Sequence, residues 1–325
     1  MTLTITDATA GRDLRATAEH LRNALATGEL ELPLPGSGGT RRRWARLAAW
    51  GRADLPFARL AEGHTDAVAI LAEAGARPVP GALYGVWAAR PGGRGAHLQR
   101  TADGRLVLRG TVRFCSGARV LDRALVVAED GAEPPVLVEV GVAGARPDPQ
   151  SWRSAAMAAS DTLDVEFVAA PVDEVVGPPG WYTARRGFLA GGGGVAAVWW
   201  GGAAGLLDLA RQHLPAEPDA HQLAHLGELT ALLEAADALL DRVAAVVDEP
   251  TGPDLELPIA RLRAVVERVV REVLDRVPRM LGAGPMSGAA DIARMHADLG
   301  IYVRQHHAER DHAALGAAEL REHRA

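Results

Sequence analysis

The stretch RLVLRGTVRFCSGARVLDRALVVAED, from Arg105 to Asp130, decides the fold that the sequence predicts. The rest of the chain is rich in Ala-Arg-Leu helical patterns, whereas this stretch has the pattern of two β-strands around a Phe-Cys-Ser-Gly turn. Turn signals such as TADG and AEDGAEPP separate further short β-rich runs between residues 81 and 184. Short strands at this spacing indicate an antiparallel barrel or sandwich, so we expect a small β domain in the middle of a helical chain.

Helical patterns flank this β region on both sides. Residues 1–80 predict an N-terminal helical domain, broken by the Pro/Gly loop LELPLPGSGGT. Residues 185–325 contain four apolar-periodic runs with short connections, which predict a C-terminal four-helix bundle. The last run, GAADIARMHADLGIYVRQHHAERDHAALGAAEL, predicts a single helix. We therefore expect an α+β fold with domains at 1–80, 81–184 and 185–325.

Composition excludes several classes of function. The 325 residues carry a net charge of -6, so there is no basic footprint for nucleic acid. No apolar run reaches the roughly 18 residues that span a bilayer, and the N-terminus lacks a signal-peptide pattern. A single cysteine, Cys115, rules out a disulfide framework, and the absence of lysine rules out a Schiff base or a Walker A loop. We expect a cytoplasmic protein without a metal site.

The order of helices, β domain and bundle, together with three motifs, resembles the acyl-CoA dehydrogenase family. The motifs are YGVWAARPGGRGAHLQRTADGRLVLRGTVRFCSGARVLDRALVVAE, WRSAAMAASDTLDVEFVAAPVDEVVGPPG and RMLGAGPM. The resemblance implies FAD held between the β domain and the bundle, a homo-oligomer (dimer or tetramer), and α,β-dehydrogenation of an acyl-CoA thioester. It also implies a kinship with flavin-dependent monooxygenases, which share the fold.

The resemblance assigns cofactor-binding roles to three groups of residues. Phe114, Cys115 and Ser116 fall where the family packs an aromatic residue and a small hydroxyl residue against the isoalloxazine ring, whose N5 and O4 need a hydrogen-bond donor. The other two groups are the loop at Tyr84, Trp87 and Ala88, and the turn at Gly282 and Gly284.

Each assignment has a plain structural alternative. FCSG is equally a core Phe, a buried Cys and a turn, and Gly282 is equally a helix C-cap. PGGRG (residues 91–95), with Arg94, either cradles an anion or forms a surface turn.

The chain departs from the dehydrogenase pattern at the catalytic base. The family's Glu position in the last bundle helix falls at about Val303 in GIYVRQHH, and the alternative position in RRGFLAGGGGVAAVWW contains no acid. The diphosphate-binding feature of the family is also not recognisable. His306 and Glu309, at i and i+3 of a helix, are the candidate catalytic replacements, and the alternative is a solvated helix with ion pairs. His64 is a candidate substrate contact, with ordinary packing as its alternative.

Three functions remain open at this point. The first is an FAD-binding acyl-CoA dehydrogenase-like oxidoreductase acting on an acyl thioester or another small molecule. The second is a flavin-dependent monooxygenase or oxidase on the same fold, favoured by the missing Glu and by His306. The third is a non-catalytic homologue that serves as a subunit or scaffold, with Trp199 and Trp200 exposed at an oligomer interface.

Overall fold

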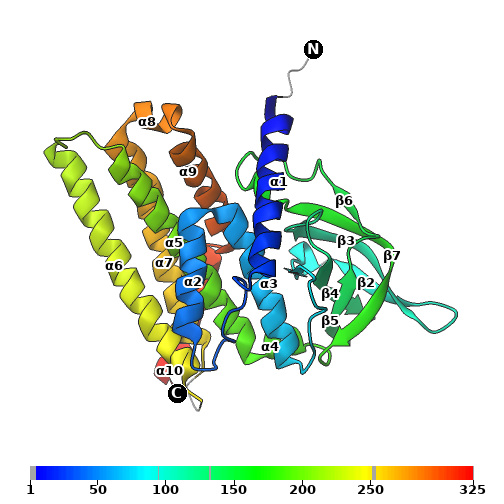
Figure 1. Cartoon of the computed structure of the whole chain (residues 1–325). Helices are drawn as coiled ribbons and strands as arrows, with labels where there is room; N and C mark the ends of the chain where they lie inside the picture. Colours follow the sequence, from blue (N-terminus) through cyan, green and yellow to red (C-terminus); the bar gives the residue numbers. More distant parts are fainter. Residues whose placement is uncertain (1–4, 94, 132, 251–253, 325) are drawn as a thin grey trace. The chain divides into compact units, whose positions relative to one another are not determined.

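The computed structural model describes residues 5–93, 95–131, 133–250 and 254–324, which form two compact units (Figure 1). The first unit contains the chain up to Leu32 and Arg59–Phe188, and the second contains Pro33–Ala58 and Leu189–Ala325. Residues Pro33–Ala58 of the N-terminal helical region therefore belong to the same compact unit as the bundle. The division into three domains at residues 80 and 184 stays a prediction.

The first unit combines helices with all seven strands. Its helices are α1 (Ile5–Ala26), most of α3 (Leu55–Glu73) and α4 (Trp181–Ala184). Its strands are β1 (Tyr84–Trp87), β2 (Ala96–Arg100), β3 (Leu106–Cys115), β4 (Arg123–Asp130), β5 (Glu133–Gly141), β6 (Arg146–Asp148) and β7 (Leu163–Val176). The sequence predicts all of these strands except the short β6.

Five of the strands close into a barrel. Strand β4 pairs with β2 and with β5, and the ring continues from β2 through β3 and β7 back to β5. Strand β1 pairs with the first half of β4 and β2 with its second half. Closure matters because a barrel has no open edge and therefore satisfies its backbone hydrogen bonds internally.

The expectation of a purely antiparallel domain is wrong in one place. Strands β1 and β2 both run parallel to β4. The reason is the connection after β3: the turn at residues 116–122 reverses the chain, and β4 then pairs with β2 instead of β3. Because β2 and β4 both run opposite to β3, they are parallel to each other.

Helix α3 and strands β4, β5 and β7 share the core of the first unit. Ala67, Ile70 and Leu71 of α3 pack with Leu125 of β4 and Leu137 of β5, all buried. Helix α1 is fastened to the start of β4 by a bidentate contact, since the Arg22 guanidinium lies 2.6 Å from Oδ2 of Asp122 and 2.9 Å from its Oδ1. The same carboxylate accepts a hydrogen bond of 2.7 Å from the backbone N–H of Leu83, just before β1.

The second unit is the helix bundle. Its helices are α2 (Thr40–Ala53), α5 (Arg186–Gln212), α6 (Ala220–Asp248), α7 (Glu256–Leu281), α8 (Ala283–Gly288), α9 (Ala290–Tyr302) and α10 (Glu309–Arg324). The predicted fourth bundle helix is therefore wrong as a single element, because the chain leaves the helix between α9 and α10. His306 has an extended backbone there, and Ala308 has a φ of 44°.

Helices α2 and α5 touch backbone to backbone. A Cβ atom added to Gly201 would lie 2.0 Å from the carbonyl oxygen of Ala48, and one added to Gly205 would lie 2.3 Å from that of Arg52. From the other side, a Cβ on Gly51 would lie 2.4 Å from the carbonyl oxygen of Val198. Only glycine allows this approach, which explains the glycine-rich sequence of α5 better than membrane contact does.

The end of α6 caps the start of α2. Oδ1 of Asp248 accepts hydrogen bonds from the N–H of Gly38 and the hydroxyl of Thr40, and its Oδ2 accepts one from the N–H of Thr40. A carboxylate is favoured at a helix N-terminus, where free N–H groups and the helix dipole attract negative charge. Among the described residues, no helix is both long enough and apolar enough to cross a membrane.

We predict that Gly201→Ala destabilises the protein because its methyl group has no room beside the Ala48 carbonyl. The expected loss in the free energy of unfolding is about 1–3 kcal/mol or more, measured by urea denaturation. Gly227→Ala in α6 is the matched control, since a Cβ there meets no atom within 4 Å. It should stabilise the protein by about 0.5–1 kcal/mol, and equal effects of the two changes would contradict the close contact.

Candidate functional site

The predicted flavin-binding turn is a strained corner between β3 and β4. Phe114, Met157 and Asp161 have positive φ angles of 59°, 57° and 48°, and they are three of the four non-glycine residues with positive φ among those described. Such a conformation costs about 1–3 kcal/mol per residue and persists only where the surroundings enforce it. Strain of this kind concentrates at functional sites, so the corner is the first place to look for one.

Buried Asp161 enforces the conformation of the corner. Its carboxylate accepts hydrogen bonds from the backbone N–H of Arg119 at 2.6 Å and from the guanidinium of the same residue at 2.5 and 2.8 Å. Two backbone bonds join the same segments, from Gly117 to the carbonyl of Ser160 and from Ala118 to that of Asp161. The turn before β7 and the turn after β3 therefore form one rigid piece.

Three hydroxyl groups form a chain across this corner, and proton counting fixes its direction. The Ser160 hydroxyl must donate to the Met157 carbonyl, 2.7 Å away, since a carbonyl only accepts. Thr162 must then donate to Ser160 at 2.8 Å, because the single hydroxyl hydrogen of Ser160 is already in the bond to the Met157 carbonyl. Ser116 must in turn donate to Thr162 at 2.9 Å. In this order the Ser116 oxygen keeps lone pairs but no free proton, which differs from the hydrogen-bond donor that the family resemblance implies at this position.

Phe114 presents its ring to the outside of the corner. Its side chain is exposed (47%), and the guanidinium of Arg113 lies 4.9 Å from the ring centroid. The backbone N–H of Phe114 points to Oδ1 of Asp164 at 3.4 Å, and the Arg113 Nε lies 3.2 Å from Oδ2 of the same carboxylate. An exposed aromatic ring on a strained, well-anchored backbone provides the flat apolar wall that the flavin hypothesis requires.

The other predicted residues of the first unit have mostly internal roles. Cys115 is fully buried, its thiol donates to the Val112 carbonyl at 3.3 Å, and burial raises its pKa well above the ordinary value. Trp87 is buried, and its Nε1 donates a hydrogen bond of 3.0 Å to the Ser116 carbonyl, which helps to hold the backbone of the corner in place. Tyr84 is buried and its hydroxyl donates to Glu139 at 2.8 Å. Ala88 is half-buried just after β1.

His64 has a packing role. It is buried on α3, and its Nδ1 accepts a hydrogen bond of 3.2 Å from the backbone N–H of Tyr84. Burial lowers the pKa of His64 to about 4, so the ring is neutral at physiological pH. The alternative that treated His64 as an ordinary packed histidine accounts for these contacts.

Glu62 is a titratable group that sequence reasoning missed. It lies on α3, is only 3% exposed and forms an ion pair with Arg59. Burial, followed by the repulsion of Asp66, raises the pKa of Glu62 to about 7 in spite of the Arg59 charge. Nothing in the sequence marks it, because a glutamate within a helix usually faces solvent.

His306 lies in the second unit, in the break between α9 and α10. Its ring is buried, packs edge-on to Trp199 at 6.4 Å and lies 5.2 Å from the ring of His312. Nδ1 accepts a hydrogen bond of 3.1 Å from the N–H of Ala308, so the neutral ring carries its proton on Nε2, which lies 4.0 Å from Asp311. Burial lowers the pKa of His306, and Asp311 partly offsets this effect.

The remaining predicted residues of the second unit are exposed. Glu309 begins α10 and does not share a helical face with His306, so the expected i, i+3 pairing is wrong. Gly282 has a φ of 72° and ends α7 as a C-cap, with its N–H bonded to the Pro278 carbonyl. Gly284 lies in α8 with open space around it. Arg94 of the PGGRG loop lies outside the described residues.

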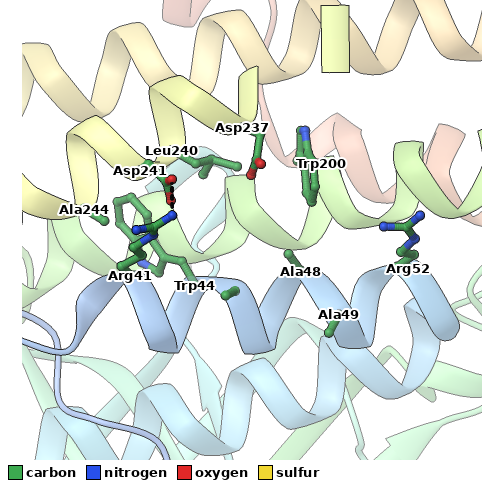
Figure 2. A pocket seen from close by; sticks show the side chains of 11 residues that line it. Arg41, Trp44, Ala48, Ala49, Arg52, Trp200, Asp237, Leu240, Asp241 and Ala244 are labelled. Carbon is green, nitrogen blue, oxygen red and sulfur yellow. Dashed lines mark hydrogen bonds and ion pairs between the residues drawn. The ribbon is translucent and has the colours of Figure 1, made fainter. Parts of the chain in front are cut away.

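The two tryptophans of α5 differ in their surroundings. Trp199 is fully buried, with the Arg263 guanidinium 4.7 Å from its ring centroid, so the expectation that both are exposed is wrong. Trp200 is half-buried and lines a hollow between α2, α5 and α6 (Figure 2). A helical turn of 100° per residue explains why neighbours in sequence have opposite environments.

Comparison with known proteins identifies the class of fold. Residues 179–302 match the family described as acyl-CoA dehydrogenase, C-terminal domain. The structure of TdsC from Paenibacillus sp. A11-2 with FMN and indole superposes with a TM-score of 0.77 at 21% identity, covering 97% of this chain and 98% of that one. Methanesulfinate monooxygenase MsuC from Pseudomonas fluorescens gives 0.78 at 19% identity, covering 99% and 98%. The chain has the acyl-CoA dehydrogenase fold.

Part of the chain is also similar in sequence to a curated protein. Dibenzothiophene monooxygenase from Rhodococcus erythropolis is 26% identical over 224 residues, which are 56% of this chain and 53% of the relative. The chain thus spans about half the length of the curated relatives it matches. The match of residues 179–302 to the acyl-CoA dehydrogenase C-terminal domain confirms the resemblance found in the sequence.

We predict that His64→Gln removes part of the acid sensitivity of the fold. In the native protein the pKa of His64 is about 4, against an ordinary 6.5, so only the unfolded state takes up a proton between these values. The contribution of the neutral His64 to the free energy of unfolding is therefore fully present above pH 6.5. It falls as the pH decreases toward 4, by up to about 3 kcal/mol. Glutamine keeps an acceptor for the Tyr84 N–H but does not titrate, so urea unfolding of this variant should show a flatter profile from pH 6.5 to 4.

The exposed His323, near the end of α10, is the matched control for this change. His323→Gln should leave the pH profile of stability as it is in the parent protein. A His64→Gln profile as steep as that of the parent would contradict a buried neutral His64.

Proposed function

We propose that this protein is a flavin-dependent monooxygenase that inserts one atom of O2 into a small organic substrate. The observation that carries the proposal is the chain of contacts from Ser116 through Thr162 and Ser160 to the Met157 carbonyl, from which we infer that Ser116 is a hydrogen-bond acceptor. Reduced flavin, when bound, supplies two electrons and carries an N–H group at N5, whereas oxidised flavin has only a lone pair there. We place N5 near Ser116, whose oxygen then favours the reduced cofactor.

The missing catalytic base supports the same function. A dehydrogenase needs a carboxylate to remove the α proton of an acyl thioester, and loss of such a base costs about 10²–10⁴-fold in rate. Val303 is buried at the family's usual position, and residues 186–200 of α5 contain no acid. A monooxygenase has no such requirement, because O2 takes the two electrons from reduced flavin, one oxygen atom enters the substrate and the other leaves as water.

The comparisons support both the reaction and the cofactor. All three proteins named above are monooxygenases, and the TdsC structure contains FMN. We propose FMN over FAD, because the diphosphate-binding feature of the family is not recognisable in this sequence. The acyl-CoA dehydrogenase function with FAD, first suggested by the family resemblance, becomes the second candidate.

The residues that we propose to hold the flavin each have a defined task. The Phe114 ring provides the apolar wall, and the Asp161–Arg119 contact keeps the strained backbone of the corner in place. Ser116 would accept a hydrogen bond from the N–H group at N5 of reduced flavin. We propose His306 of the second unit as a hydrogen-bond donor, because its Nε2 carries the proton of the neutral ring. Glu309 has no contact that supports a catalytic role.

The activity is tested by loading the purified chain with FMN. With chemically reduced FMN and O2, we expect an oxygenated product from at least one of dibenzothiophene, indole or methanesulfinate, with isotopically heavy oxygen incorporated from O2. The competing dehydrogenase is tested anaerobically by adding octanoyl-CoA to oxidised flavin-loaded protein. Bleaching of the flavin by the thioester, without oxygenated product in the first assay, would establish the second candidate instead.

We predict that Thr162→Val reverses the redox preference of the bound flavin. Valine cannot accept the Ser116 proton, which then becomes free to donate to the N5 lone pair of oxidised flavin. The ratio of the dissociation constants of oxidised and reduced FMN should fall about tenfold, which is a downward shift of about 30 mV in the potential of bound flavin. Equilibrium dye titration measures this potential without any turnover.

Thr162→Ser is the matched control, because it keeps the hydroxyl chain and should keep the potential. A potential that is the same in the Val variant and the parent would contradict the role of Ser116 as an acceptor. Failure of all three proteins to take up FMN would contradict the flavin function itself.

A further inference from the structure

One feature of the second unit that the proposed function does not use is the hollow beside Trp200. It lies between α2, α5 and α6 and has a volume of about 250 Å³. This volume is just below the roughly 300–1,000 Å³ of pockets for drug-sized ligands, so it fits a molecule with one ring. All of its lining residues belong to the second unit, and none is among the residues proposed to hold the flavin.

The hollow exists because α5 packs closely against α2 through glycines but is held apart from α6 by the bulky Trp200. Helices α2 and α5 meet at their backbones through Gly201 and Gly205, and the small side chains Ala45, Ala48 and Ala49 of α2 line the hollow there. The bulky Trp200 stands between α5 and α6, with its Nε1 fixed by a hydrogen bond of 3.0 Å to the Leu233 carbonyl of α6. A large side chain on one wall and alanines on another leave a slot (Figure 2).

The slot is apolar along its floor and aromatic at its wall. Alanines, Trp44, Leu240 and Ala244 contribute carbon surface, and the ring of Trp200 rises beside Asp237 in Figure 2. Such surfaces bind a flat or aliphatic body through the hydrophobic effect. The face of an indole ring also attracts a cation, especially where water is partly excluded.

The carboxylates around the slot are not all paired. Arg41 pairs with Asp241 at 2.5 Å, and Arg52 pairs with Asp208 at 2.5 Å, so both arginines already have carboxylate partners. Asp237 has no hydrogen-bond or ion-pair partner among the described residues. Partial burial, together with the neighbouring Asp241 and Glu234, raises the pKa of Asp237, and the charge of Arg41 partly offsets this effect. One carboxylate without a contact partner therefore stands beside an aromatic face.

We propose that this slot binds a small organic ammonium ion with a single ring or a short apolar body. The apolar part lies along Ala45, Ala48 and Ala49, and the ammonium group lies between the Asp237 carboxylate and the Trp200 ring. An anion is disfavoured because both arginines already contact a carboxylate. A neutral ligand leaves the Asp237 carboxylate without a partner, so the charge of the ligand determines selectivity.

The experiment is an isothermal titration of the full chain with 2-phenylethylammonium chloride near neutral pH. The neutral analogue 2-phenylethanol, which has the same ring and chain length, is titrated in parallel. We expect the ammonium ion to bind about tenfold more tightly than the alcohol, and Asp237→Asn to remove this difference. Asp275→Asn, at an exposed ion pair on α7, changes the net charge equally and should keep the parent affinity.

A second variant tests the place of binding. Ala49 lines the slot and is exposed, so Ala49→Phe fills the space without entering the core and should abolish binding of both compounds. Unchanged melting temperatures show that each variant is folded. The proposal is overturned if the ammonium ion gives no binding up to about 10 mM, where affinity is only a few kcal/mol. It is also overturned if the alcohol binds equally well, or if Asp237→Asn binds the ammonium ion like the parent.

Discussion

The contact between the backbones of α2 and α5 is the constraint on which the second unit depends. The positions of closest approach on α5 follow one another at intervals of four, with Gly201 against Ala48 and Gly205 against Arg52. Because residues four apart lie on one helix face, a single stripe of small residues fixes both the distance and the rotation of α5. That rotation turns Trp199 into the core and leaves Trp200 beside the slot.

A different constraint governs the first unit, where the decisive quantity is the number of protons in a short chain of hydroxyl groups. Ser160 is tied to a carbonyl, and each of the following hydroxyls has only one proton to give. The direction of the hydrogen bond at Ser116 therefore depends on Thr162 and Ser160. Strain at Phe114 and Asp161 is compatible with this order because the Asp161–Arg119 contact makes the corner rigid. The hydrogen-bonding role of Ser116 is therefore set by the residues that it contacts more than by its own residue type.

The sequence predicts the elements well and their connections less well. Alternation of apolar residues and turn signals locate six of the strands, because these are local properties of the chain. Parallel pairing of β4 with β1 and β2 depends on contacts between distant segments, and no local signal announces it. The break at His306 was missed for a related reason, since RQHHAERDH has the charge pattern of a helix but leaves it at Ala308.

The residues of the candidate site also fall into those that the sequence indicates and those that only the structure reveals. Motif resemblance found Phe114 and Ser116, whose residue types and spacing carry information. It could not find Thr162 as a partner, although the spacing S-x-T is visible in AASDT, because the direction of a hydrogen bond depends on geometry. Glu62 and Asp237 were missed because an acidic residue on a helix looks ordinary until its burial or its lack of a partner is known.

The barrel described above also bears on how copies of the chain avoid joining edge to edge. A sheet exposes unpaired N–H and C=O groups at its edges, where another chain can add a strand and start aggregation. The five-strand ring removes most such edges, and β6 is short, carries Pro147 between two charged residues and pairs with β7 alone among the described strands. The N–H of Tyr84 at the start of β1 is taken by His64. Replacing Pro147 would therefore be a change in solubility before it is a change in stability.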